Sequence, residues 1–200
     1  MSQVPVTIDQ PYLVVDSPYR LERWRPLVNW VLYIPHAVIL YGLQILSRVV
    51  FVVYWLMLIF TGNLHAGMFN IMAMYERYNS RATGFLLGYS ATYPPFDFNA
   101  STSDNGAYPP IRLTLPTVPE VVTRSAALNV FKAIPHYIVL MAYFFAAAVV
   151  AVIGWFAVLF TGEWPKGMRD FLVRVSNYYY RVWTYVTMVD NSYPPFGLPT

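Results

Sequence analysis

The 200-residue chain contains no cysteine, and only 12% of its residues are charged, against about 25% in a typical soluble domain. The absence of cysteine excludes disulfides, iron–sulfur clusters and thiolate chemistry. Aspartate and glutamate together number 10, and none of them forms a close pair on an apolar segment. No Ser-His-Asp order typical of a triad stands out. We therefore expect a protein that is not an enzyme and has no cofactor.

Apolar residues make up 57% of the chain and gather in two long runs. Residues 138–160 contain no Asp, Glu, Lys, Arg or His, and residues 37–60 are interrupted by Gln44, Ser47 and Arg48. At about 1.5 Å per residue, each run can cross the roughly 30 Å hydrocarbon core of a bilayer. The sequence therefore predicts an α-helical integral membrane protein. Residues 1–16 lack the features of a signal peptide, so we expect them to be retained.

The chain is a tandem duplication with an offset of 100 residues. When residues 29–96 are set against 129–196 without a gap, 20 of 68 positions are identical. We therefore expect a first repeat at 1–100 and a second at 101–200, packed about a pseudo-twofold axis normal to the membrane.

Each repeat reads as four parts in the same order. An extended segment (5–15 and 108–115) is followed by an amphipathic lead-in rich in Arg and Trp (21–33 and 124–133). The apolar helix then begins near Pro35 or Pro135, where a kink or a restart is expected. It ends at Gly62 or Gly162, since glycine readily closes a helix C-terminus. A second, polar-striped helix covers 68–92 or 168–189.

The length of the second helix permits it to cross the bilayer too, which predicts four transmembrane helices, two per repeat. The alternative is two spans with two interfacial helices. In the four-span arrangement both repeats point the same way, and the extended segments and basic lead-ins gather on one face. The excess of Arg and Lys there predicts a bacterial cytoplasmic (inner) membrane protein with both termini in the cytoplasm. Asn63 and Glu163 then lie outside.

Several motifs recur in both repeats: Ile-Pro-His, an apolar helix ending Phe-Thr-Gly, Gly-Met, and Tyr-Pro-Pro-Phe at 93–96 and 193–196. This combination resembles a bacterial membrane family catalogued as a domain of unknown function, number 4389, which often occurs in two copies. The resemblance covers nearly the whole chain. In the family the turn after Thr-Gly usually contains proline, which repeat one lacks. The resemblance implies an architecture and no activity.

Two sets of polar residues are candidate sites. His36 and His136 occupy equivalent positions, and they are either axial ligands of a haem or metal, or local partners of the backbone near a proline. Arginine on an apolar or striped helix marks either an internal seam for anionic lipid, or structural ion pairing with acids such as Glu76 and Asp170. The arginines concerned are Arg48, Arg77, Arg81, Arg174 and Arg181.

Small residues in repeat two occupy positions that carry mostly bulky residues in repeat one. We expect Ala147, Ala151 and Gly154 to form a helix-packing surface, and Val150 to face lipid.

The leading functional hypothesis is an accessory or scaffold subunit of a larger inner-membrane complex. The alternative is a small lipid-binding or transport protein that uses the arginine seam. The expected partners are the lipid bilayer, other membrane subunits and anionic lipid. A net charge of +3 is too small to indicate nucleic-acid binding.

Overall fold

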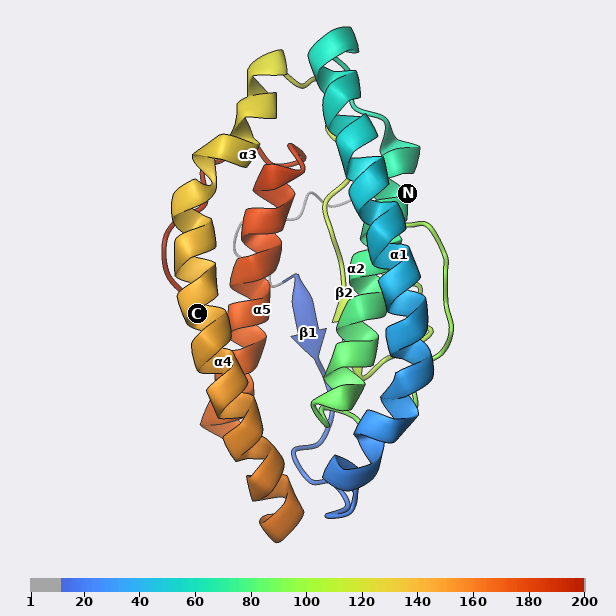
Figure 1. Cartoon of the computed structure of the whole chain (residues 1–200), viewed down its shortest axis with the longest axis vertical. Coiled ribbons are helices and arrows are strands. Elements are labelled where there is room, and N and C mark those ends of the chain that lie inside the picture. Colours follow the sequence, from blue (N-terminus) through green and yellow to red (C-terminus); the bar gives the residue numbers. More distant parts are fainter. Residues whose placement is uncertain (1–11, 200) are drawn as a thin grey trace.

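The computed structural model describes residues 12–199 and consists of two helical hairpins with a pair of short strands between them (Figure 1). Repeat one supplies α1 and α2, and repeat two supplies α4 and α5 after two short helical turns. In chain order, the elements are β1 (Leu13–Val15), α1 (Arg25–Thr61), α2 (Ala66–Leu86), β2 (Ile111–Leu113), the 3₁₀ turn η1 (Arg124–Leu128), α3 (Asn129–Lys132), α4 (Ile134–Thr161) and α5 (Lys166–Val186).

The two prolines at equivalent positions have different effects on the backbone. Pro135 lies in the first turn of α4, where its missing N–H has no helical acceptor to lose. The lead-in before it is broken into η1 and α3. Pro35 instead lies inside α1, which continues through the lead-in as one helix of 37 residues. The restart expected at proline is therefore found in repeat two alone.

Both apolar helices end as predicted. Gly62 and Gly162 have left-handed φ angles of 78° and 76°, and their N–H groups donate to Leu58 and Val158 at 2.9 and 2.8 Å. The second helices are shorter than predicted. Gly88 and Met188, with φ of 73° and 60°, turn the chain away two residues after α2 and α5 end.

The two hairpins run in opposite directions, so the expectation that both repeats share one direction is wrong. The turn of each repeat lies against the lead-in of the other (Figure 1). The Leu21 N–H donates to the Gly162 carbonyl at 2.9 Å, and Trp155 Nε1 donates to the Pro26 carbonyl at 2.8 Å. At the other end, Trp55 Nε1 donates to the Ala127 carbonyl at 2.9 Å. These bonds can form only between antiparallel hairpins.

The helices differ in burial according to their place in the hairpins. Within the described residues, α1 and α4 are the helices long and apolar enough to cross a membrane, so the expected four spans are not confirmed. In the most apolar 18 residues of each, only 11% are buried. By contrast, α2 and α5 carry most of the buried residues of the hairpins, including charged ones.

The extended segment of each repeat packs on the second helix of the other repeat. β1 pairs antiparallel with β2, with Leu13 opposite Leu113. β1 packs on α5 of repeat two, whereas β2 packs on α2 of repeat one. The strand predicted over 108–115 is thus found at Ile111–Leu113, and residues 5–11 of the other segment lie outside the described residues.

The small residues of α4 pack against the molecule's main core cluster. Gly154 is buried beneath Trp164 of the following turn, and a β-carbon there would lie 1.9 Å from the indole. Ala147 and Ala151 pack partly against the same cluster. Val150 does so too, so its predicted exposure to lipid is wrong.

Candidate functional site

Two of the five candidate arginines hold a loop in place. The Arg81 side chain on α2 is 1% exposed, and it lies 2.9 Å from the Asp97 carboxylate and 3.0 Å from that of Asp104. Arg77, one turn earlier, donates to the carbonyls of Asn99 and Ser101 at 3.1 Å each. The buried charges are therefore compensated within the protein. Their partners are in the 97–104 loop, and not Glu76 or Asp170 as the structural interpretation expected.

The other three arginines do not form one seam with these two. Arg174 is exposed and Arg181 is half-buried on α5, and among residues 12–199 neither has a carboxylate within 4 Å. Arg48 is exposed on α1, and among the described residues it too has no carboxylate within 4 Å. The structure therefore separates the predicted seam into structural and surface residues.

The two histidines lie in equivalent but separate aromatic clusters. The His36 Nδ1 is 2.6 Å from the Tyr78 hydroxyl, and its ring stacks on Phe96 with centroids 4.6 Å apart. His136 repeats this arrangement with Tyr178 at 2.7 Å and Phe196 at 4.3 Å. The Tyr-Pro-Pro-Phe tail of each repeat thus folds back over its own histidine.

This geometry does not bring the histidines together as a ligand pair. Each is fully buried within its own hairpin, with Nδ1 occupied by tyrosine. Among the described residues, no group of three or more His, Asp or Glu side chains is placed to hold a metal ion. The repeated motifs therefore build one structural unit in each hairpin.

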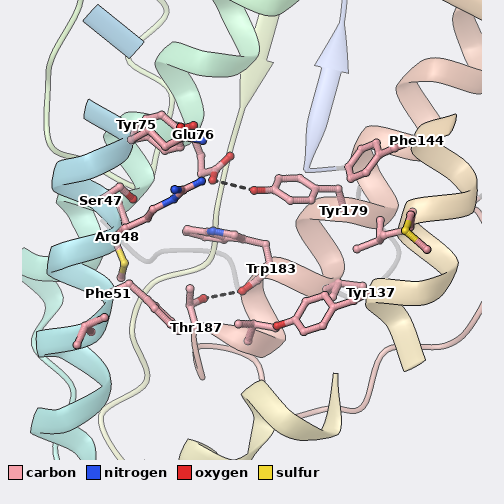
Figure 2. Close-up of a pocket in the computed structure, with 17 residues that line it drawn as sticks. Ser47, Arg48, Phe51, Tyr75, Glu76, Tyr137, Phe144, Tyr179, Trp183 and Thr187 are labelled. Carbon is pink, nitrogen blue, oxygen red and sulfur yellow. Dashed lines mark hydrogen bonds between the residues drawn. The ribbon is translucent and has the colours of Figure 1, made fainter. Parts of the chain in front are cut away.

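A large cavity lies between the two repeats and is the best candidate site (Figure 2). Its volume is about 740 Å³, within the range of small-molecule sites. All four long helices line it. Most of the lining is apolar, and the polar or charged members are Gln44, Ser47, Arg48, Glu76, Thr187 and the tyrosines 75, 137 and 179.

The floor of the cavity carries a buried carboxylate. Glu76 on α2 is 3% exposed, and its Oε1 accepts a 2.9 Å hydrogen bond from the Tyr179 hydroxyl on α5. Its second oxygen has no hydrogen-bond partner among the described residues. Burial raises the pKa of Glu76 to about 7, because the ionised form loses its hydration, and the bond from Tyr179 only partly opposes this. A hydrogen-bond donor or a cation in the cavity would satisfy this group.

The rim of the cavity is mostly apolar and carries one charged residue, an arginine. Val52 on α1 and Met141 and Phe144 on α4 are exposed, whereas the floor residues on α2 and α5 are buried or half-buried. Figure 2 shows Arg48 extending from α1 toward Glu76. The cavity thus opens between α1 and α4, with a cation at its edge and a carboxylate at its base.

A second cavity sits at the other end of the interface between repeats. Its volume is about 440 Å³, and its lining contains no charged residue. Ala151 and Val152 of α4 line it, where Phe51 and Val52 of α1 line the larger cavity. The two cavities are therefore related by the duplication, but only the larger one carries charge.

Sequence reasoning missed the features that make this site. Tyr179 is the middle one of three consecutive tyrosines, whose side chains contact His136, Glu76 and the core respectively. Arg169 was also missed. It is buried and donates to the Ser17 and Pro18 carbonyls at 2.9 Å, and thereby fixes the segment after β1. One sequence feature could have indicated this site: repeat two has no glutamate equivalent to Glu76 and no arginine equivalent to Arg48.

Comparison with known proteins identifies the family and nothing beyond it. A family described as Domain of unknown function (DUF4389) matches residues 23–97 and again 124–197. The chain therefore belongs to this family in two tandem copies, which confirms the resemblance. No curated protein and no solved structure matches the chain.

Proposed function

We propose that this two-copy member of the DUF4389 family is a non-enzymatic membrane protein that holds a membrane lipid between its repeats. The observation that carries the proposal is the 740 Å³ cavity, with its apolar rim and the unpartnered oxygen of Glu76 at its floor. An acyl chain fits the apolar walls between α1 and α4. The polar atoms of the floor are then left for a headgroup.

The charges favour a zwitterionic headgroup with a primary ammonium. An ammonium N–H donates to the free oxygen of Glu76, and the guanidinium of Arg48 binds the phosphate of the same lipid. Phosphatidylethanolamine has both groups, whereas phosphatidylglycerol has the phosphate without the ammonium. The site therefore discriminates between these lipids at Glu76. This differs from an arginine seam, because four of the five candidate arginines take no part in the cavity.

Lipid binding to the purified protein tests the proposal. Native mass spectrometry in detergent, with each lipid titrated separately, is expected to show tighter binding of phosphatidylethanolamine than of phosphatidylglycerol. Glu76→Gln should reduce phosphatidylethanolamine affinity about tenfold, which corresponds to about 1.4 kcal/mol. Glu120→Gln, at an exposed carboxylate, is the matched control and should change nothing. Equal affinity for both lipids, or full affinity in Glu76→Gln, would reject the proposal.

An accessory subunit of a larger complex, in the bacterial inner membrane, is the second candidate function. It is favoured by the apolar side chains that α1 and α4 leave exposed, which a partner helix can cover as well as lipid can. Purification from native membranes in mild detergent separates the two functions. A discrete complex of fixed composition supports the subunit role, and a lone protein with bound lipid counts against it.

A further inference from the structure

The exposed apolar surface of α1 and α4 is longer than the hydrocarbon core of a bilayer is thick. Exposed large apolar side chains run from Leu27 to Phe60 on α1 and from Ile134 to Phe160 on α4. At 1.5 Å per residue these stripes measure about 50 and about 40 Å, whereas the hydrocarbon core is about 30 Å thick. Helices that cross the membrane along their own axes would leave apolar ends outside the hydrocarbon core.

The opposite face of the molecule is polar at its middle. The strands contact α2 and α5, and within the described residues they do not contact α1 or α4. Figure 1 places β1 about halfway along the molecule. Beside it, Arg112 on β2 pairs with Asp16 at 3.6 Å, and their side chains are 47% and 76% exposed. The 97–104 loop, with its exposed asparagine and serine residues, covers α2 on this face.

These polar segments are incompatible with a long axis normal to the membrane. In that orientation the exposed edges of a two-stranded sheet and an irregular loop would lie in hydrocarbon. Each unsatisfied backbone group costs several kcal/mol there, and exposed charges at that depth are costly too. Turning the long axis into the membrane plane removes both costs, because the polar face then lies in water.

We propose that the protein lies flat on the bilayer, with α1 and α4 submerged side by side in one leaflet and the strand face in water. The exposed apolar face of α1 and α4 is thus covered by the acyl chains of a single leaflet. Exposed basic residues at the two ends of the molecule then lie at the headgroup level, where they attract anionic lipid. They are Arg20, Arg23 and Lys166 at one end, and Arg124 and Lys132 at the other. This orientation does not depend on the lipid proposed for the cavity.

Spin labels on single cysteines measure the orientation directly, since the chain has no cysteine of its own. The label positions are Val31, Tyr41, Val49 and Phe60, which are all exposed on α1. Collision rates with oxygen and with a water-soluble nickel chelate are measured in liposomes that contain phosphatidylethanolamine and phosphatidylglycerol. We expect all four labels at a similar lipid depth, and a label at Arg112 in water.

A spanning orientation gives a different pattern. Depth would then peak at Tyr41 and Val49 and fall to water at the two ends, and this result overturns the proposal. Protection of all four labels from both reagents indicates a protein partner on this face and overturns it as well. Labelling by an impermeant maleimide is the second measurement. Cysteines at Asn63 and Glu163, at opposite ends of the molecule, should react from the same side of the membrane, and reaction from opposite sides rejects the flat orientation.

Discussion

The two repeats share the residues that build each hairpin and dock it on the other, and differ in the residues that line the cavity and hold the extended chain. Asn29 and Asn129 both donate to the last turn of the second helix, at the Phe85 and Tyr185 carbonyls. The histidine–tyrosine pairs, the tryptophans that reach the opposite lead-in and the left-handed glycines are likewise present twice. The shared positions therefore specify each hairpin and its antiparallel contact.

The unshared positions lie in the cavity and on the face of α2 or α5 that holds the extended chain. Glu76 and Arg48 correspond to Ser176 and Ala148, so only one of the two related cavities is charged. Arg77 donates to carbonyls of the 97–104 loop. Its counterpart Asn177 instead hydrogen-bonds both the N–H and the carbonyl of Leu13 in β1. After duplication, the framework of the hairpins and their tryptophan contacts have thus been kept, while the cavity and the contacts with the extended chain have diverged.

The largest expected effect on stability comes from replacing Arg81, and replacing its counterpart Arg181 should have much less effect. Arg81→Met leaves Asp104 without its cation, and leaves Asp97 with Arg77 alone, at 3.8 Å. Removing one partner of a buried ion pair costs about 3–5 kcal/mol. We expect that loss in the free energy of unfolding, measured by chemical denaturation in detergent. Arg181→Met is the matched control and should cost less than about 1 kcal/mol. Equal losses would show that the buried pairs contribute nothing.

The second effect depends on pH and is specific to repeat one. Glu76 lies on α2, outside the two most apolar helices, and its pKa is about 7 in the folded protein against 4.5 ordinarily. The unfolded chain therefore releases this proton at lower pH than the folded protein does. Stability is full below about pH 4.5, falls as pH rises to about 7, and then stays lower. The loss is about 3 kcal/mol, from about 1.4 kcal/mol for each pH unit.

Glu76→Gln should remove this pH dependence. The variant is expected to match the wild-type protein near pH 4 and to exceed its stability by about 3 kcal/mol at pH 8, in denaturation experiments without added lipid. Glu120→Gln should keep the wild-type profile. A wild-type stability that rises between pH 4.5 and 7, or a variant that keeps the fall, contradicts the burial of this carboxylate.

Much of each hairpin could be predicted from the sequence because its determinants are local. The thirty or so residues of apolar helix, the glycine that ends it and the polar stripe of the next helix can each be recognised within one window. The direction of one hairpin relative to the other could not. It depends on contacts such as Trp155 with Pro26, which are 129 residues apart. Either direction fits the hydropathy equally well.

The cavity was unpredictable for a related reason. Its central hydrogen bond joins Glu76 and Tyr179, which are 103 residues apart and have no equivalents in the duplication. The comparison of repeats showed which positions differ, including Arg48. It did not show that these positions meet. The arginines show the reverse case, because the five residues grouped as one candidate site have three different environments.

The smallest expected effect tests whether the shared framework is equivalent in the two repeats. Tyr78→Phe and Tyr178→Phe each remove one hydroxyl from a buried histidine, at 2.6 and 2.7 Å. A buried hydrogen bond contributes about 1 kcal/mol net, so each variant should lose about that much unfolding free energy. Tyr41→Phe, at a tyrosine that is 69% exposed on α1, should lose nothing. Because the rings and the covering Tyr-Pro-Pro-Phe segments match in both hairpins, the two losses should agree within about 0.5 kcal/mol and should add in the double variant. If one loss is large and the other absent, only one histidine–tyrosine pair stabilises its hairpin, and the divergence has reached the framework as well as the cavity.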